Sequence, residues 1–201
     1  MAQRGVTRTK VLATARLLFQ RQGYHATGVN QILEEADAPK GSLYFHFPGG
    51  KQQLATEAVT LGAQELGELI DAVIDDAPDP ASAVRTIADL LAKQLEDSDF
   101  LDGCPITTVA LEAGGSDPIR DACRAGYDRW LISIADAFVG AGLRRIEATE
   151  LAMVVLSTIE GGLLLARTRR DAALLRTVAA HVADQVAAAL LKHRGTAKPP
   201  S

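Results

Sequence analysis

The chain has 201 residues, of which 47% are hydrophobic and 23% charged, so it is long enough for one globular domain or a small two-part protein. This composition excludes a collagen-like, a coiled-coil-only or a wholly disordered chain, and we find neither a signal-peptide core nor an uninterrupted apolar run of about 20 residues. We therefore expect a cytoplasmic protein. Cys104 and Cys123 should stay reduced, because their spacing fits neither a metal pair nor a disulfide scaffold.

The formal net charge of −4 is unevenly distributed along the chain. Residues 1–51 hold seven Lys or Arg against three Asp or Glu, a net charge of +4, whereas residues 52–201 hold 14 against 22, a net charge of −8. A polyanion would be attracted to the first quarter of the chain and repelled by the rest. Chance clustering of charge on a solvated face is the alternative explanation.

Helix-favouring residues dominate throughout and alternating β-branched runs are missing, so the sequence predicts an all-α protein of about nine helices. Three short helices open the chain, with predicted bounds of 9–23, 27–36 and 39–45. Thr27 is the expected cap of the second, and Asp37 lies in the tight turn before the third. Pro48 and the diglycine that follows it end this group.

Longer helices follow, and Gly and Pro mark most of their ends. The first of these predicted helices spans 51–76, and the next is capped by Asp79 and ends before Asp97. A short helix runs from Pro105 to Gly114-Gly115, and a longer one begins at Ser116 and Pro118 and ends at Gly140 and Gly142. The last two predicted helices span 146–170 and 171–193.

The second and third helices fit a helix-turn-helix, whose second member enters the major groove of DNA. Helical hairpins also occur in bundles, so composition has to decide. The third helix presents a cation, a position without a side chain, a hydroxyl and two amphipathic rings, namely Lys40, Gly41, Ser42, Tyr44 and His46. Lys51 begins the long helix, where its ammonium and the free amides would face a phosphate.

The stretch 27–54, reading TGVNQILEEADAPKGSLYFHFPGGKQQL, resembles the DNA-binding signature of TetR-type transcriptional regulators. The resemblance implies a homodimer with seven positions that touch DNA: Thr27, Lys40, Gly41, Ser42, Tyr44, His46 and Lys51. Two residues depart from the family pattern. Asp37 replaces the usual Gly but tolerates a left-handed conformation, and Pro39 replaces Ser or Thr and so removes a hydroxyl and an N–H.

A narrower resemblance, to the LmrA/YxaF-like branch whose members repress drug-efflux genes, rests on three runs: Phe-Pro-Gly-Gly-Lys at 47–51, Gly103-Cys104-Pro105-Ile106, and Ala110-Leu111-Glu112. The charge division at residue 51, together with the resemblance, predicts a helix-turn-helix DNA-binding domain at 1–51 and a ligand-sensing and dimerisation domain at 52–194. The last residues of the sequence, 195–201, are expected to form a disordered tail. We expect a repressor that binds a palindromic double-stranded DNA operator as a homodimer. A small hydrophobic effector would release it, and no cofactor, metal or membrane is expected to take part.

Two further sets of residues are candidates for sensing and assembly. Apolar walls with a few polar groups indicate an effector site at Phe100, Cys104, Thr107, Leu111, Tyr127 and Trp130. Aromatic residues at helical spacing are, however, more often core. The last two helices hold more apolar surface than one protomer needs, which indicates a dimer interface at Thr158, Ile159, Gly162, Val182 and Val186. A buried face within one chain explains that pattern equally well.

Other functional classes have less support. The four histidines are scattered, and no G-x-S-x-G, P-loop or H-E-x-x-H motif is present, so we predict neither an enzyme nor a metal site. The Glu34-Glu35 and Asp75-Asp76 pairs diverge by about 100° around a helix and read as solvated faces. A helical ligand-binding or interaction protein without DNA binding is the remaining alternative, but it predicts a third helix without cations.

Overall fold

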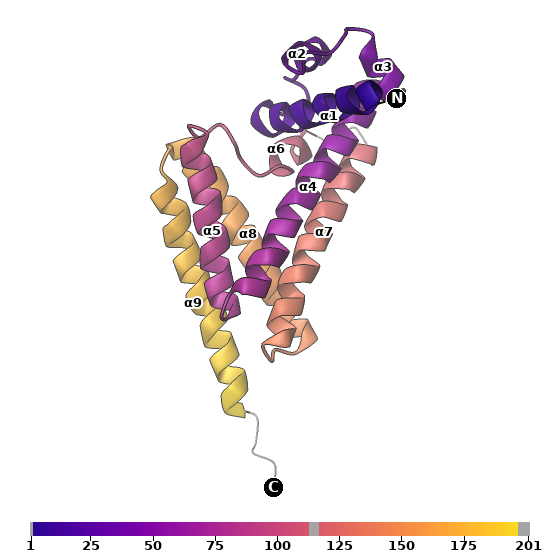
Figure 1. The fold of residues 1–201 in the computed structure, drawn as a ribbon. Helices are drawn as coiled ribbons and strands as arrows, with labels where there is room; N and C mark the ends of the chain where they lie inside the picture. Colours follow the sequence, from indigo (N-terminus) through magenta and orange to yellow (C-terminus); the bar gives the residue numbers. More distant parts are fainter. Residues whose placement is uncertain (1, 113–116, 197–201) are drawn as a thin grey trace. The chain divides into compact units, whose positions relative to one another are not determined.

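The computed structural model describes residues 2–112 and 117–196, and within these ranges all regular secondary structure is helical (Figure 1). The described helices are α1 (Ala2–Gln22), α2 (Val29–Glu35), α3 (Ser42–His46), α4 (Gly50–Asp76), α5 (Pro80–Asp97), α6 (Thr107–Ala110), α7 (Asp117–Gly140), α8 (Arg145–Arg169) and α9 (Ala172–Thr196). The prediction of an all-α protein is confirmed. The helix end expected at Gly114-Gly115 and the helix start expected at Ser116 lie outside the described residues.

Two compact units make up the chain. The first unit comprises Met1–Leu66 and Asp102–Tyr127, and the second unit comprises Gly67–Leu101 and Asp128–Ser201. Helices α4 and α7 each run from one unit into the other. The division predicted from the sequence, at residue 51, concerns function and stays a prediction.

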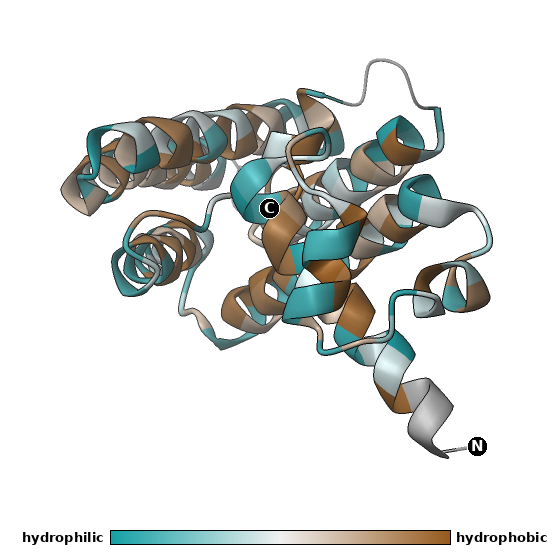
Figure 2. Ribbon diagram, turned by 90° about the horizontal axis from the view of Figure 1, so that it is seen from above, coloured by the Kyte–Doolittle hydropathy of each residue, from teal (hydrophilic) through white to brown (hydrophobic). Residues whose placement is uncertain are grey.

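Helix α1 is amphipathic and forms much of the core of the first unit. Val11, Ala15, Leu18 and Phe19 are buried, and their spacing of three and four residues places them on one face. Figure 2 shows apolar and polar residues interspersed along the other helices as well. The helix starts at Ala2, well before the Thr9 expected from the sequence, and it ends as predicted at Gly23, which has a φ of +83°.

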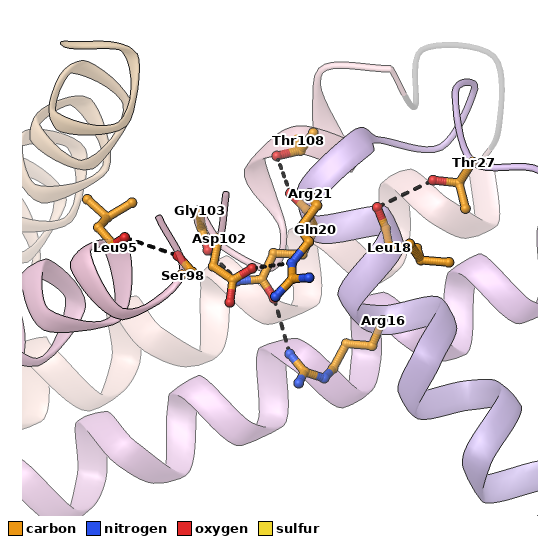
Figure 3. A network of polar contacts seen from close by, with 10 residues as sticks. All are labelled: Arg16, Leu18, Gln20, Arg21, Thr27, Leu95, Ser98, Asp102, Gly103 and Thr108. Atoms are coloured by element: carbon orange, nitrogen blue, oxygen red, sulfur yellow. Dashed lines mark hydrogen bonds and ion pairs between the residues drawn. The ribbon is translucent and has the colours of Figure 1, made fainter. Parts of the chain in front are cut away.

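Thr27 does not cap the second helix, contrary to the prediction. Gly28 holds the N-cap position of α2, without a side-chain cap. The Thr27 hydroxyl instead donates to the carbonyl oxygen of Gly23, at 2.7 Å. It also contacts the carbonyl oxygen of Leu18, at 3.3 Å (Figure 3). Thr27 therefore ties the turn after α1 back to the end of that helix, and its side chain is fully buried.

The turn between α2 and α3 adopts the geometry expected for Asp37, whose φ is +50°. Helix α3 begins later than predicted, at Ser42 rather than Pro39. The reason is a turn in which the Pro39 carbonyl accepts hydrogen bonds from both the Ser42 N–H, at 2.8 Å, and the Ser42 hydroxyl, at 2.7 Å. Residues 39–41 thus lead into the helix without belonging to it.

In the second unit, α9 packs along both α5 and α8 (Figure 1). Small residues line the buried faces and let the helix axes approach, for example Ala88, Ala92, Ala152, Ala179 and Ala183. Asp79 caps α5 as predicted, accepting the Ser82 N–H at 2.9 Å. The disordered tail was expected from residue 195, but α9 continues to Thr196, and residues 197–201 lie outside the described part.

Two helices are long and apolar enough, by length and composition alone, to cross a membrane: α8, and the part of α9 over Ala172–His193. Neither contains an uninterrupted apolar run of about 20 residues, because charged residues such as Glu160 in α8 and Asp184 in α9 interrupt them. Core helices of soluble proteins meet the same criterion. Here each helix buries one face against its neighbours in the second unit.

Candidate nucleic-acid interface

Helix α3 is anchored on one side and displayed on the other. Leu43 and Phe47, four residues apart, are 1% and 0% exposed and fix the short helix to the core of the first unit. Tyr44 and Phe45, in contrast, are 71% and 63% exposed. Two large rings in water have no role in the core of this unit, so α3 presents a surface suited to a partner.

Phe45 was missed by the sequence reasoning, which took it for the end of the helix. The signal was available, because Leu43 and Phe47 occupy the inward face and a residue midway between them must point outward. The rings of Phe45 and half-buried His46 meet edge to face, with centroids 4.9 Å apart. Phe45 therefore extends the predicted set of exposed residues on α3.

The residues that precede and begin α3 are accessible. Lys40 and Gly41 are exposed, and Ser42 is half-buried. No atom lies within 4 Å of the place where a Cβ on Gly41 would be, so packing in this chain does not require a glycine there. The absent side chain leaves room for close approach by another molecule.

Lys51 lies half-buried at the start of α4, near the turn that follows α1. Its Nζ is 4.5 Å from the centroid of the Tyr24 ring, a distance typical of a cation over an aromatic face. Burial lowers the pKa of the Lys51 ammonium, and the negative charge of Glu112 acts in the opposite direction. The ring therefore fixes the position of a cation beside α3.

The corner between α3 and α4 is tied to α1 by a polar network that sequence reasoning also missed. Arg8 pairs with Glu57 and lies over the Phe47 ring, 4.9 Å from its centroid. Glu57 accepts a hydrogen bond from the Gln53 amide at 2.9 Å, and Gln53 in turn accepts the Gly49 N–H at 2.8 Å. Arg8 and Glu57 are 49 residues apart in the sequence, so no local pattern marks that pair.

Thr27 is placed differently from the other predicted DNA contacts. Its side chain is 0% exposed and its hydroxyl is bonded to α1. A contact between Thr27 and DNA stays a prediction, and it would have to use the backbone. The other six predicted residues lie in the first unit on or next to α3 and the start of α4.

The segment 102–112 is docked on the end of α1 within the first unit (Figure 3). Asp102 pairs with Arg21 at 2.5 Å, the Gly103 carbonyl accepts the Gln20 amide, and the Thr108 hydroxyl donates to the Gln20 carbonyl at 3.0 Å. The Gly-Cys-Pro-Ile run singled out in the sequence therefore belongs to a segment that contacts the end of α1.

The residues predicted to bind an effector are divided between the two units. In the first unit Cys104 is buried, Leu111 is exposed, and the hydroxyls of Thr107 and Tyr127 lie 2.8 Å apart. In the second unit the Phe100 ring lies beneath Arg170, and Trp130 is fully buried, which favours the alternative of a core residue.

A hollow of about 380 Å³ is present in the second unit. The residues that line it are Leu143, Glu147, Glu150, Leu151, Val154, Ala189, Lys192 and His193. None of the residues predicted for the effector belongs to this set.

Both cysteines of the chain are free and buried, and burial raises the pKa of the Cys123 thiol to about 11.

Most of the predicted dimer interface lies inside a single chain, which corrects the prediction. Ile159, Gly162, Val182 and Val186 are all buried in the second unit, and Thr158 is half-buried. A Cβ on Gly162 would lie 3.2 Å from a methyl group of Leu175, so this glycine serves the close approach of α8 and α9. The sequence pattern had allowed either a dimer or a core face.

A different face of α8 is exposed and apolar. Met153, Val154, Leu164 and Leu165 are each between 46% and 52% exposed. At 100° per residue they fall within about 120° of arc. The same arc holds the exposed residues Ser157, Gly161 and Thr168.

The sequence matches two family models. Residues 11–58 match the bacterial regulatory proteins of the tetR family, and residues 80–181 match the C-terminal domain of LmrA/YxaF-like transcriptional regulators. The uncharacterized HTH-type transcriptional regulator YxaF of Bacillus subtilis (strain 168) is 39% identical over 183 residues, which cover 90% of this chain and 96% of YxaF. The HTH-type transcriptional regulator LmrA of the same strain is 37% identical over 181 residues, with the same coverage of each chain.

Solved structures share the fold. A TetR transcriptional regulator from Chloroflexus aurantiacus J-10-FL superposes with a TM-score of 0.79 at 26% identity, covering 93% of this chain and 97% of that one. A cysteine mutant of the TetR-family regulator CifR, solved in complex with a 26-bp double-stranded operator DNA, superposes with a TM-score of 0.74 at 21% identity, covering 88% and 94%.

Proposed function

Because the chain belongs to the TetR family of transcriptional regulators, we propose that it is a cytoplasmic repressor that binds a palindromic operator as a homodimer and is released by a small hydrophobic effector. Family membership makes it a transcriptional regulator with a helix-turn-helix DNA-binding domain. The enzyme alternative is excluded, since the matched families and relatives are transcriptional regulators.

The exposure of Tyr44 and Phe45 on a helix anchored by Leu43 and Phe47 is the observation that carries the DNA-binding site. Tyr44 and Phe45 would contact base edges and sugars in the major groove. Phosphates would be bound by the two cations beside the helix, Lys40 and Lys51. Gly41, Ser42 and His46 complete the proposed contact surface.

The proposed homodimer forms through the exposed face of α8. In a symmetric dimer the same surface of each protomer contacts its copy on the partner. An apolar strip along a single helix is suited to such a contact. Gly161 lies within the strip with no neighbour near its Cβ position, so a second helix could approach closely. Pairing would remove four large apolar side chains from water: Met153, Val154, Leu164 and Leu165.

The effector is proposed to act by shifting a two-state balance. A dimer whose two α3 helices lie about 34 Å apart would match two successive major grooves. A ligand that prefers a dimer with another spacing lowers operator affinity in proportion to that preference. In the first unit, Cys104, Thr107, Leu111 and Tyr127 offer apolar groups and two hydroxyls for such a ligand.

The test of this function is a titration of the purified full-length chain against the DNA upstream of its own coding sequence. We expect a specific shift that survives nonspecific competitor DNA and weakens linearly in log salt. A two-to-one ratio of protomers to operator supports the homodimer. A screen of apolar compounds in the same assay tests the effector, and a chain that binds this DNA no better than competitor DNA contradicts the DNA-binding proposal.

A further inference from the structure

Glu112 reaches from the end of α6 to the turn after α1, within the first unit. Its carboxylate accepts the backbone N–H of His25 at 2.7 Å. A Cβ on Gly23 would lie 2.8 Å from the carboxyl carbon of Glu112, so a side chain at residue 23 would displace this carboxylate from its present position. A glycine at position 23 therefore serves two purposes: it adopts a positive φ, and it leaves room for the Glu112 carboxylate.

The turn that Glu112 contacts carries the ring that supports Lys51. Tyr24 lies between Gly23 and His25, and its ring packs against Phe19 at 6.0 Å and against His25 at 5.2 Å, measured between centroids. Lys51 places its Nζ 4.5 Å from the centroid of the same ring. The Glu112 side chain, two residues beyond the end of α6, is therefore connected through residues 23–25 to a proposed phosphate contact.

We propose that Glu112 is a positioning residue for DNA binding: it holds the turn 23–25 in the conformation that keeps the Tyr24 ring beneath the Lys51 ammonium. This inference rests on the proposed function and adds to it a residue outside the helix-turn-helix. Glu112 itself would not contact DNA. It belongs to the Ala-Leu-Glu run that the DNA-binding signature does not account for.

The Glu112 carboxylate has two effects of opposite sign on operator affinity. Its hydrogen bond to the turn favours binding by fixing Lys51. Its negative charge also attracts the Lys51 ammonium, but its larger effect is to disfavour binding because it repels phosphate. Two substitutions separate these effects. Glu112→Ala removes both the acceptor and the charge, while Glu112→Gln removes the charge and keeps an oxygen that can accept the His25 N–H.

The positioning role predicts different outcomes for the two variants. Glu112→Ala should weaken operator binding by about tenfold, the factor that one lost hydrogen bond to a charged acceptor can produce. Glu112→Gln should bind at least as tightly as the unsubstituted protein. If both variants bind more tightly, Glu112 acts only as a repulsive charge, and if neither changes affinity it has no role; either result overturns the proposal.

A double-substitution cycle separates positioning from a general loss of stability. Tyr24→Leu removes the aromatic ring that supports the Lys51 ammonium. If Glu112 acts through that ring, adding Glu112→Ala to Tyr24→Leu should have little further effect on operator affinity. A full tenfold loss in the Tyr24→Leu background would show that Glu112 does not act through the ring. Glu65→Ala is the matched control, because Glu65 also pairs with α1, through Arg16 at 3.1 Å, but does not touch the turn.

A measurement on the free protein keeps the two proposals distinguishable. Amide hydrogen exchange at His25 should accelerate in Glu112→Ala and stay near the original rate in Glu112→Gln and Glu65→Ala. If exchange at His25 is the same in all variants, the Glu112 inference fails even where operator binding is intact. If the unsubstituted chain binds no operator, the proposed function fails instead, whatever the exchange rates are.

Discussion

The guanidinium of Arg8 lies 4.9 Å from the centroid of the Phe47 ring, which joins the first part of α1 to the residue that ends α3. Arg8 also pairs with Glu57 on α4. One side chain therefore bridges three of the helices around the proposed DNA-binding surface. The orientation of α3 depends on this corner, because Phe47 is one of only two side chains that we identify as anchors of the short helix.

Replacing Arg8 with Ala should lower the free energy of unfolding by about 1 kcal/mol, because a cation–π contact and a part-exposed ion pair are both lost. Urea denaturation followed by circular dichroism measures this change. Arg124→Ala is the control: Arg124 lies in the same unit and pairs with Asp121, but both side chains are mostly exposed, at 70% and 57%. That substitution should stay within about 0.5 kcal/mol, and equal losses for the two variants would contradict a special role for Arg8.

Tyr44→Ala and Lys51→Ala should each abolish the operator shift, and Phe45→Ala should weaken it. The exposed rings contribute little to the fold, so the thermal midpoints of Tyr44→Ala and Phe45→Ala should match that of the unsubstituted chain. Fluorescence anisotropy with labelled operator DNA measures the affinity. Ile132→Ala is the control. It also removes an exposed apolar side chain, but one on α7 and not on α3, so this variant should bind operator DNA normally. Retained binding by Tyr44→Ala would reject the site assignment.

Two adjacent glycines of α8 should respond in opposite ways to the same substitution. Gly161→Leu places a side chain on the exposed stripe, where no atom lies within 4 Å of the Cβ position, so the chain should fold normally but become monomeric. Gly162→Leu inserts the same side chain against Leu175 and Val178 and should cost about 2 kcal/mol by overpacking. Analytical ultracentrifugation and urea denaturation distinguish the two outcomes. A Gly161→Leu chain that stays dimeric would place the interface elsewhere.

The N-cap of α5 should make a pH-dependent contribution to stability. Hydrogen bonds from the Ser82 N–H and hydroxyl hold the pKa of Asp79 below its usual value. Because the folded-state pKa is the lower one, the stabilisation is fully present at neutral pH and declines as the pH falls below about 4. Asp79→Ala should therefore cost about 1 kcal/mol at neutral pH and less in acid.

Asp79→Asn provides the control for the cap, because an amide oxygen can accept the same Ser82 N–H without titrating. The difference in unfolding free energy between Asp79→Asn and Asp79→Ala should not change with pH. Urea denaturation at a series of pH values gives all three curves. A cost of Asp79→Ala that is constant from neutral pH into acid would show that ionisation of the cap contributes nothing.

Local signals in the sequence were sufficient for the helical architecture. Gly23 and Asp37 mark left-handed turns, Asp79 followed by Pro80 marks a helix start, and each has the backbone geometry or the hydrogen bond that was expected. These features depend on neighbours within a few residues, so they can be read in order along the chain. The same local signals gave a wrong prediction for Thr27. Its neighbours indicate a helix cap, but in the folded chain its hydroxyl instead bonds to the carbonyl of Gly23 and contacts that of Leu18.

The tertiary structure alone decided which apolar faces are covered. Periodicity places Ile159, Gly162, Val182 and Val186 on helical faces, but it does not say whether those faces meet another helix of the same chain or a second copy. The contacts of Arg8 with Glu57 and of Glu112 with His25 span 49 and 87 residues, and no local pattern marks such partners. The sequence by itself therefore determined the fold class, the family signature and the segment 40–46, which contains α3. Which side chains support that helix was settled by packing, since burial and pairing depend on residues that only folding brings together.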